Sequence, residues 1–353
     1  MNFKCLLIFL TPMLLFGEVQ REASVPVTPL KDATKSAQTC HDLNGVYVTA
    51  DFLYWKARQD GMEYVAVFEA SFPSNTFSQV SIRSIEIDFE YKPGFRLGLG
   101  GDLPWDGWDL YLNWTRLSFD ISSTKTSNQA DLDLIEGLFS SPPFLGTRAR
   151  IDWDLTHNAL DFEMGRRLFL SSSLTVRPAW GLKTVWFDEE IKRRLDHVEL
   201  FNPNGPGLPG APEFLNFDFD IWGIGPMLSL SGKWNWAYGL GLVGQFSGAI
   251  LWYDIDQNTH VQDNGVEDQG GSVRVVTQAN VKLKYDTNRI RPWVQAFVGL
   301  DWEWCFIPNW LSVQLAIGYE VQYFWSMFVD PINSLDDLPI SFEGLTVKAR
   351  IDF

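Results

Sequence analysis

The sequence predicts an all-β protein, a transmembrane antiparallel β-barrel with long outer loops and short periplasmic turns. Three observations lead to this fold class. Apolar and polar residues alternate along many long segments, aromatic residues make up 15% of a chain whose mean hydropathy is only −0.08, and the last residue is aromatic. Alternating strands reconcile the aromatic content with near-neutral hydropathy, because lipid-facing and lumen-facing residues average out.

The N-terminus predicts secretion. Lys4 precedes a short apolar run and Gly17 follows it, which is the layout of a signal peptide. The run is shorter than the roughly 20 apolar residues that a membrane-spanning helix needs. We therefore expect a signal peptide over 1–17, a flexible periplasmic tail over 18–41, and the barrel over 42–353.

Period-2 alternation runs through most of the remaining chain and is typical of strands with one apolar and one polar face. For example, Leu311, Val313 and Leu315 alternate with Ser312 and Gln314. Long polar connections mostly alternate with short ones, as in membrane barrels. The predicted strands are 45–57, 84–101, 107–119, 148–167, 173–187, 215–230, 235–254, 272–286, 290–304, 310–325 and 343–353.

The number of strands is harder to predict than their positions. The segments are odd in number, whereas bacterial single-chain barrels use an even number, and the short gaps 287–289 and 305–309 fall in succession. We therefore expect about twelve strands, within a range of about 10 to 16. The alternation also changes phase between Leu155 and Leu160, which predicts a bulge near Asn158.

Aromatic residues gather where predicted strands meet turns, as in the girdles at the two interfaces of a membrane barrel. These residues are Trp105, Trp108, Trp234, Trp236, Trp302, Trp304, Trp310, Phe324 and Trp325. Ordinary core packing could explain any one of them, but it explains the whole set less well.

The end of the chain predicts an assembly signal. Val347, Ala349, Ile351 and Phe353 alternate with polar residues, and Phe353 is the last residue. This pattern resembles the signal by which the barrel-assembly machinery recognises its clients. We expect that machinery, periplasmic chaperones and outer-membrane lipid as partners.

Four segments make the resemblance closer. They are GVYVTADFLYWKARQDGMEY (45–64), KPGFRLGLGGDLPWDGWDLYLNWT (92–115), LDFEMGRRLFLSSSLTVRPAWGLK (160–183) and EGLTVKARIDF (343–353). In order and over most of the mature chain, they resemble the chlamydial major-outer-membrane-protein-like family of pore-forming proteins. The resemblance implies a porin in a Gram-negative outer membrane. The many cysteines of the abundant porin of that group are missing here, so a heavily cross-linked envelope role is not expected.

We accordingly expect passive diffusion of ions and small solutes through a water-filled lumen. Side chains opposite the apolar faces would line it, because successive side chains alternate across the wall. Charged rings in such a lumen set ion preference. The expected pore-lining residues are Glu86, Asp88, Glu90, Asp161, Glu163, Arg167, Arg177, Lys183, Arg274, Lys282 and Lys284.

The net charge limits the kinds of binding partner that we expect, and the cysteine content limits the possible disulfides. A formal net charge of −16 argues against nucleic acid, whose binding calls for basic patches. Cys5 would leave with the signal peptide, while Cys40 and Cys305 stay in an oxidising compartment. A disulfide between them requires Cα atoms within about 7 Å, so a bridge and free or intermolecular thiols both stay open.

Catalysis has little support, and we expect no enzyme, no cofactor and no metal. The sequence has no nucleophile-elbow, zinc-protease or phosphate-binding motif. Asp152, Asp154 and His157 resemble the acid–histidine pairs of barrel proteases only loosely, and we interpret them as lumen or rim residues.

Two alternatives from other functional classes stay open. One is a structural or adhesive outer-membrane barrel whose surface loops bind a partner and whose lumen is closed, because charges on the inner face can pair with one another. The other is a secreted soluble β-protein such as a lectin. A homo-oligomer is compatible with the sequence.

Overall fold

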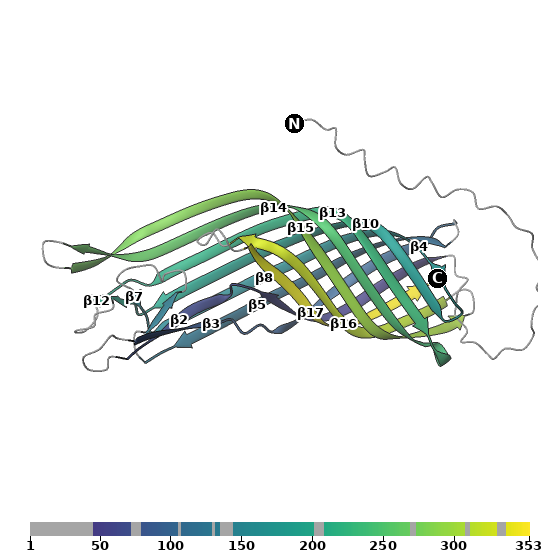
Figure 1. The fold of residues 1–353 in the computed structure, drawn as a ribbon, viewed down its shortest axis with the longest axis horizontal. Helices are drawn as coiled ribbons and strands as arrows, with labels where there is room; N and C mark the ends of the chain where they lie inside the picture. The colour runs from purple at the N-terminus through teal and green to yellow at the C-terminus, as the bar shows by residue number, and fades with distance from the viewer. Residues whose placement is uncertain are drawn as a thin grey trace, which may run out of the picture. The chain divides into compact units, whose positions relative to one another are not determined.

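The described part of the chain folds as a closed barrel of ten antiparallel strands, which confirms the predicted fold class (Figure 1). The computed structural model describes residues 45–71, 79–104, 107–128, 131–134, 144–200, 208–268, 273–307, 311–329 and 337–353. The predicted signal peptide and tail lie outside these residues. In order around the ring, the wall strands are β1 (Val46–Gln59), β4 (Tyr91–Asp102), β5 (Trp108–Thr126), β8 (Arg148–Arg166), β10 (Leu174–Asp196), β13 (Glu213–Asn235), β14 (Leu240–Asp268), β15 (Val273–Ile307), β16 (Leu311–Val329) and β17 (Asp337–Asp352).

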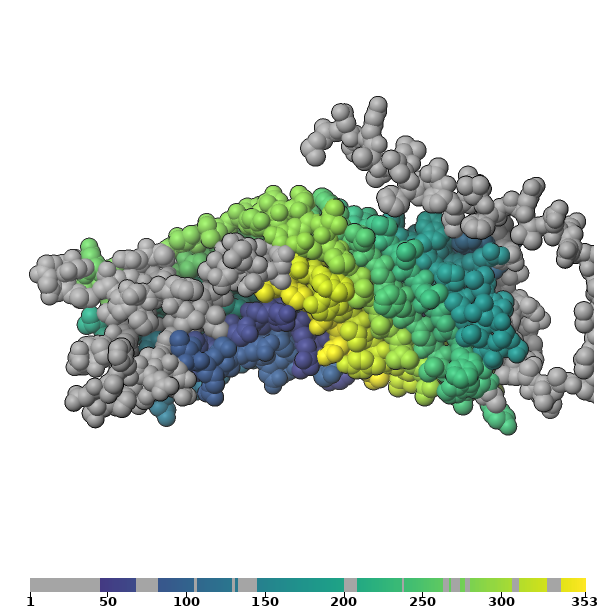
Figure 2. Space-filling model, viewed as in Figure 1, coloured from purple at the N-terminus to yellow at the C-terminus, as the bar shows by residue number. Residues whose placement is uncertain are grey.

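The last wall strand closes the ring against the first. β17 pairs with β1 from Tyr47 opposite Asp352 to Gln59 opposite Ile340. In Figure 2 the yellow C-terminal strand accordingly lies beside the purple N-terminal strand. Since the strand number is even, β1 begins and β17 ends at the same end of the barrel, which is the end with the short connections.

Short strands occupy the connections at the other end. One three-stranded sheet contains β2 (Glu63–Ser71), β3 (Gln79–Glu86) and β6 (Leu132–Leu134). A second contains β7 (Phe144–Leu145), β11 (Glu199–Leu200) and β12 (Leu208–Pro209). On the periplasmic side, β9 (Leu168–Phe169) pairs with β10, and the turn η2 (Ala237–Gly239) joins β13 to β14. Within the described residues, no helix is long and apolar enough to cross a membrane.

The strand count is ten, which is within the predicted range of 10 to 16 and below about twelve, because two predicted strands are one. Segment 290–304 and the described part of segment 272–286 both belong to β15, which runs without a turn through the predicted gap 287–289. Most of the predicted loop 255–271 is likewise strand, since β14 continues to Asp268. Polar residues there resemble a turn, but they lie in a hairpin that extends beyond the membrane, where water can solvate outward-facing polar side chains.

The phase change in β8 has a different cause from the predicted bulge. Trp153 and Leu155 face the interior, while Leu160 and Phe162 face outward, yet β8 pairs with β5 and β10 without a register shift. The bulge near Asn158 is therefore wrong. The medium outside the wall changes from water to lipid at this level. Apolar side chains therefore face the interior in the part of β8 beyond the membrane, and they face outward in the part that lipid surrounds.

Two aromatic girdles mark the membrane boundaries. Trp222 and Trp252 meet at 5.3 Å between ring centroids on the extracellular side, and Trp234 and Trp236 meet at 5.9 Å on the periplasmic side. The exposed rings at the extracellular level are Trp114, Trp186, Trp222, Trp252 and Trp325. Those at the periplasmic level are Trp234, Trp236, Trp302 and Trp304. Phe324 is not among them, because its side chain points inward and is fully buried. Trp105 and Trp310 lie outside the described residues.

Candidate functional site

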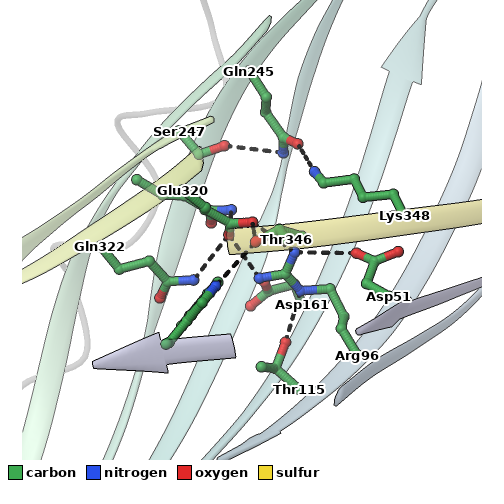
Figure 3. A network of polar contacts seen from close by, with 12 residues as sticks. Asp51, Arg96, Thr115, Asp161, Gln245, Ser247, Glu320, Gln322, Thr346 and Lys348 are labelled. Atoms are coloured by element: carbon green, nitrogen blue, oxygen red, sulfur yellow. Dashed lines mark hydrogen bonds and ion pairs between the residues drawn. The ribbon is translucent and has the colours of Figure 1, made fainter. Parts of the chain in front are cut away.

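Within the membrane part of the barrel, Arg96 of β4 forms the centre of a polar network in the lumen (Figure 3). Its Nη2 donates to Oε1 of Glu320 on β16 at 2.8 Å, and its Nη1 donates to Oε2 at 3.3 Å. Nη1 also donates to Asp51 on β1 at 3.3 Å, and Nε donates to Thr115 Oγ1 on β5 at 2.9 Å. Three other strands therefore hold one guanidinium.

Glu320 collects the remaining donors of this network. Its carboxylate accepts hydrogen bonds from Gln295 at 2.5 Å, Thr346 at 3.1 Å and Gln322 at 3.3 Å. Because burying a charge is costly unless it is paired and hydrogen-bonded, this saturation explains how a fully buried carboxylate is tolerated. We call Asp51, Arg96, Thr115, Gln295, Glu320, Gln322 and Thr346 the Arg96 network.

A second buried ion pair lies beside the Arg96 network, on β8 and β10, where β8 pairs with β5. Nζ of Lys183 on β10 donates to Asp161 on β8 at 2.8 and 3.0 Å. The same ammonium lies 4.0 Å from the ring centroid of Trp293, a cation–π contact. Strands β8, β10 and β15 are thereby connected through the lumen rather than only around the wall.

Further ion pairs lie toward the periplasmic rim. Arg177 pairs with Asp109 at 2.5 Å and with Glu163 at 2.7 Å. Lys233 pairs with Asp301 at 2.7 Å and with Glu303 at 2.6 Å. These residues come from β5, β8, β10, β13 and β15, so oppositely charged side chains face one another around the rim.

A cavity of about 310 Å³ lies between the rim and the Arg96 network. Its lining runs from Asn235, Ser312 and Asp352, near the periplasmic ends of their strands, to Asp51 and Arg96. Ligand pockets in proteins begin at about this size. The cavity is therefore large enough for water and small polar solutes.

Aromatic side chains fill the lumen on the extracellular side of the network. We call His157, Phe187, Trp293, Phe324 and Phe342 the aromatic layer; each is at most 1% exposed. The His157 ring stacks on Phe187 at 4.3 Å and on Phe342 at 5.1 Å, and meets Phe324 edge-on at 5.5 Å.

The His157–Phe324 contact spans the barrel. Strand β8, which carries His157, and strand β16, which carries Phe324, are five strands apart in either direction around the ring. Rings from opposite walls touch, so the packed side chains leave no water-filled passage at this level. Among the described residues, the side chains of the aromatic layer fill the lumen at this level.

Beyond the extracellular girdle the outer face is acidic. Asp188, Asp220 and Asp256 lie opposite one another on β10, β13 and β14. Partial burial, together with the neighbouring carboxylates Asp188 and Asp256, raises the pKa of Asp220. Across the described residues, no group of three histidine, cysteine or acidic side chains has a geometry that could hold a metal ion.

One buried carboxyl lies at the same level but faces inward. Glu189 follows Asp188 on β10, beyond Trp186 of the girdle, and accepts a hydrogen bond from Trp153 Nε1 at 2.6 Å. Burial raises the pKa of Glu189 to about 8, an effect that the Trp153 hydrogen bond opposes. Sequence patterns gave no sign of this residue.

Five of the expected pore-lining residues do face the lumen. Asp161, Glu163, Arg167 and Arg177 line the cavity, and Lys183 is buried beside Asp161. All five have oppositely charged partners, so their charges are neutralised within the protein.

The other six do not face the lumen. Glu86, Asp88 and Glu90 are exposed, because the residues between them, Ile87 and Phe89, are buried in the core. This short segment lies beyond the membrane part of the wall, so its apolar side points inward. Arg274, Lys282 and Lys284 are exposed on the extension of β15, where Lys284 pairs with Asp256 at 3.6 Å.

The three residues at the centre of the network are not among the predicted pore-lining residues. Arg96, Asp51 and Glu320 each lie on the polar side of an otherwise apolar strand, a pattern that could have identified them. What the pattern could not show is that they meet across the lumen.

His157 and the two nearby aspartates do not form an acid–histidine pair. His157 points into the aromatic layer, while Asp152 and Asp154 point outward, because even and odd positions of a strand face opposite sides. Asp152 instead accepts bonds from Arg150 at 2.7 to 3.0 Å.

Two further predictions concern the disulfide and the last strand. Cys305 is disulfide-bonded, but Cys5 and Cys40 lie outside the described residues, so its pairing with Cys40 stays a prediction. Ile351 and Phe353 face outward, and the backbone N–H of Phe353 donates to Val46 O at 3.1 Å. Their role as an assembly signal also stays a prediction.

A family comparison shows what this chain is similar to along its sequence. The sequence model described as the Legionella pneumophila major outer membrane protein precursor matches residues 40–353. The match covers the whole barrel. It does not specifically confirm the resemblance to the chlamydial family, which stays a prediction. No curated protein matches the chain.

Three solved structures with a similar trace are distant in sequence. The outer membrane protease OmpT from Escherichia coli is 10% identical, with a TM-score of 0.43 over 89% of this chain and 99% of that chain. The Pseudomonas putida toluene transporter TodX is 10% identical, with a TM-score of 0.31 over 89% and 91%. A Pseudomonas aeruginosa FadL homologue is 8% identical, with a TM-score of 0.26 over 88% and 90%. At these scores the similarities carry no inference about this chain.

Proposed function

The chain belongs to the Legionella pneumophila major outer membrane protein family and lies in the Gram-negative outer membrane, and we propose that it is a closed barrel that presents its extracellular part to a binding partner. The single observation that carries the closed lumen is the aromatic layer. His157 on one wall touches Phe324 on the opposite wall, and both side chains are shielded from water.

The extracellular part supports the second half of this proposal. Strands β14 and β15 continue beyond Trp252 of the girdle as far as Asp268 and Val273, and two three-stranded sheets lie in the other connections (Figure 1). A packed core under these strands would hold the surface connections in place, which favours a role in binding.

A passive porin is the second candidate, and one observation favours it. Charged and polar side chains contribute to the lining of the 310 Å³ cavity, which reaches the periplasmic rim, as one half of an aqueous path would. Rearrangement of the aromatic layer would be needed to connect this half to the extracellular side.

Planar-bilayer recording of the refolded protein separates the two candidates. We expect no conductance steps from the native chain, and steps after the combined change Phe187→Ala, Phe324→Ala and Phe342→Ala, which removes rings that close the lumen. The control combines Phe52→Ala and Phe95→Ala, two rings that face lipid and are 51% and 38% exposed. Regular conductance steps from the native protein would instead support the porin and overturn the closed lumen.

A further inference from the structure

Strand β15 has an open edge in the extracellular part of the barrel. β14 pairs with β15 as far as Val273, whereas β16 pairs with it only as far as Trp293. Beyond that level Ser326 of β16 has a positive φ of 50°, and Phe328 turns into the core, where it is fully buried. Among the described residues, no strand pairs with the second side of β15 over Asn280–Lys284, which we call the β15 edge.

The β15 edge has the backbone geometry to accept a further strand. Alternate N–H and C=O groups of a strand point to opposite sides, so half of those on the β15 edge point away from β14, and such groups are a template for another chain. Leu283 lies seven residues before Ile290, which is opposite Trp252 of the girdle. That separation corresponds to about 24 Å of strand. Water rather than lipid therefore surrounds the β15 edge.

The two faces of the β15 edge differ in polarity. On the inner face, Val281 is 41% and Leu283 is 48% exposed, although Thr259, opposite Leu283 on β14, is only 3% exposed. On the outer face, Lys282 and Lys284 are exposed, and the side chain of Lys284 stays 66% exposed in its ion pair with β14. A strand added here covers apolar side chains on one face and meets two ammonium groups on the other.

We propose that the β15 edge binds an extended peptide segment of a partner protein as an additional strand, with apolar side chains on the inner face and acidic ones opposite Lys282 and Lys284. Main-chain hydrogen bonds supply the affinity of such a complex, and the alternating side chains supply its specificity. The inference names the class of partner for the proposed function, and it rests on that function only in that the extracellular part binds a partner.

The charges near the edge favour an acidic segment. Outward side chains of an added strand lie about 5 Å from Lys282 and Lys284, whereas the carboxylates of β14 are a further strand away, at about 10 Å. Asp286 follows on the same face, so the acidic part of the segment ends opposite Lys284. A second copy of the chain fits less well. Two copies in one membrane present β15 in the same direction, whereas identical edges pair through a two-fold axis as antiparallel strands.

The first test compares two peptides that differ only in charge. The acetylated and amidated peptides VEVEVT and VKVKVT are titrated into the refolded native protein in an uncharged detergent at low salt and followed by fluorescence anisotropy. We expect the glutamate peptide to bind about tenfold more tightly, because two opposite-charge pairs across the strands replace two like-charge pairs. Non-specific attraction to a chain of net charge −16 would favour the lysine peptide instead. Equal affinities, or tighter binding of the lysine peptide, would overturn the proposal.

A second pair of peptides tests the main-chain hydrogen bonds. Only alternate residues of an added strand direct their N–H groups to β15. VEVEVT is therefore N-methylated either at its valines or at its other residues. We expect one of these two peptides to lose binding and the other to keep it. Equal effects of the two modifications would rule out strand addition.

Variants then test the assigned lysines. Lys282→Glu combined with Lys284→Glu should reverse the preference, so that the lysine peptide binds more tightly. Lys192→Glu should leave the preference unchanged, because β10 pairs with a neighbour on each side. Heat-modifiable gel migration verifies that each variant is folded. An unreversed preference in the folded double variant would contradict the assignment. Should the double variant not fold, the two peptide series on the native protein still decide.

Conductance recording separates failure of this inference from failure of the proposed function. A native chain that conducts and still prefers the glutamate peptide would overturn the closed lumen and leave the β15 edge as a binding site. A native chain that neither conducts nor distinguishes the peptides would overturn the β15 edge alone.

Discussion

Arg96 and Glu320 are 224 residues apart in the sequence, yet they face each other in the lumen as a two-point ion pair, with Nη2–Oε1 at 2.8 Å and Nη1–Oε2 at 3.3 Å. Their strands, β4 and β16, are three positions apart around the ring, separated by β17 and β1. The pair therefore braces the seam where the two ends of the chain meet.

Glu320→Gln should destabilise the barrel by about 3 kcal/mol, because removing one partner of a buried ion pair leaves the other charge poorly compensated. Urea unfolding in lipid vesicles measures this loss. The control is Glu343→Gln, whose 3.0 Å pair with Arg58 is more exposed and should contribute less than about 1 kcal/mol. Equal effects of the two changes would contradict a special role for the Arg96 network.

Glu189 should make stability depend on pH in a defined direction. Its pKa in the folded chain is about 8, above the ordinary value of 4.5, so the folded state holds a proton that the unfolded chain releases. Stability is then lost as the pH rises from about 4.5 toward 8, by on the order of 4 kcal/mol at pH 7.5.

The variant Glu189→Gln should remove most of that pH dependence, because an amide of the same shape still accepts the Trp153 hydrogen bond but does not ionise. We expect it to be more stable than the native chain at pH 7.5 and similar to it at pH 4.5. Glu190→Gln, on the outward face of the same strand, serves as the control. An unchanged difference in unfolding midpoint between the two pH values would contradict the assignment.

Gly100 should tolerate no side chain. A Cβ at this inward-facing position of β4 would overlap the ring of Tyr47, which is buried and stacked on Tyr111 at 5.8 Å. Gly100→Ala should therefore cost about 1–3 kcal/mol, as overpacking does. Gly244→Ala is the matched control, since its nearest neighbour would lie at an ordinary 3.8 Å. Similar urea midpoints for both variants would sink this prediction.

Phe353→Asp should lower the amount of folded protein in the outer membrane, if the terminal strand is the assembly signal that its sequence resembles. Phe353 is 47% exposed beside the seam, so the change removes little packing within the barrel. Pulse-labelling followed by heat-modifiable gel migration gives the assembly rate. Phe169→Asp, a similarly exposed ring in a periplasmic connection, controls for the added charge. Unaltered assembly of Phe353→Asp would argue against the signal.

The sequence by itself determined the class of the fold and most of its wall. Alternation identified the strands around Val313 and Val347 because lipid on one side and polar lumen on the other impose a period of two. Rings such as Trp222 and Trp234 also marked the interfaces, since amphipathic side chains favour headgroup depth.

Tertiary structure alone decided the strand count, the direction of the charges and the state of the lumen. The charges of Glu86 and Lys282 point to solvent rather than into a pore because the wall continues beyond the membrane, where water replaces lipid outside and the apolar face turns inward. Alternation specifies which side of a strand is polar, but the same pattern suits an open or a closed lumen. In the closed barrel that we propose, the contact between His157 and Phe324 blocks the lumen, and that contact depends on two strands lying opposite each other in a ring of ten.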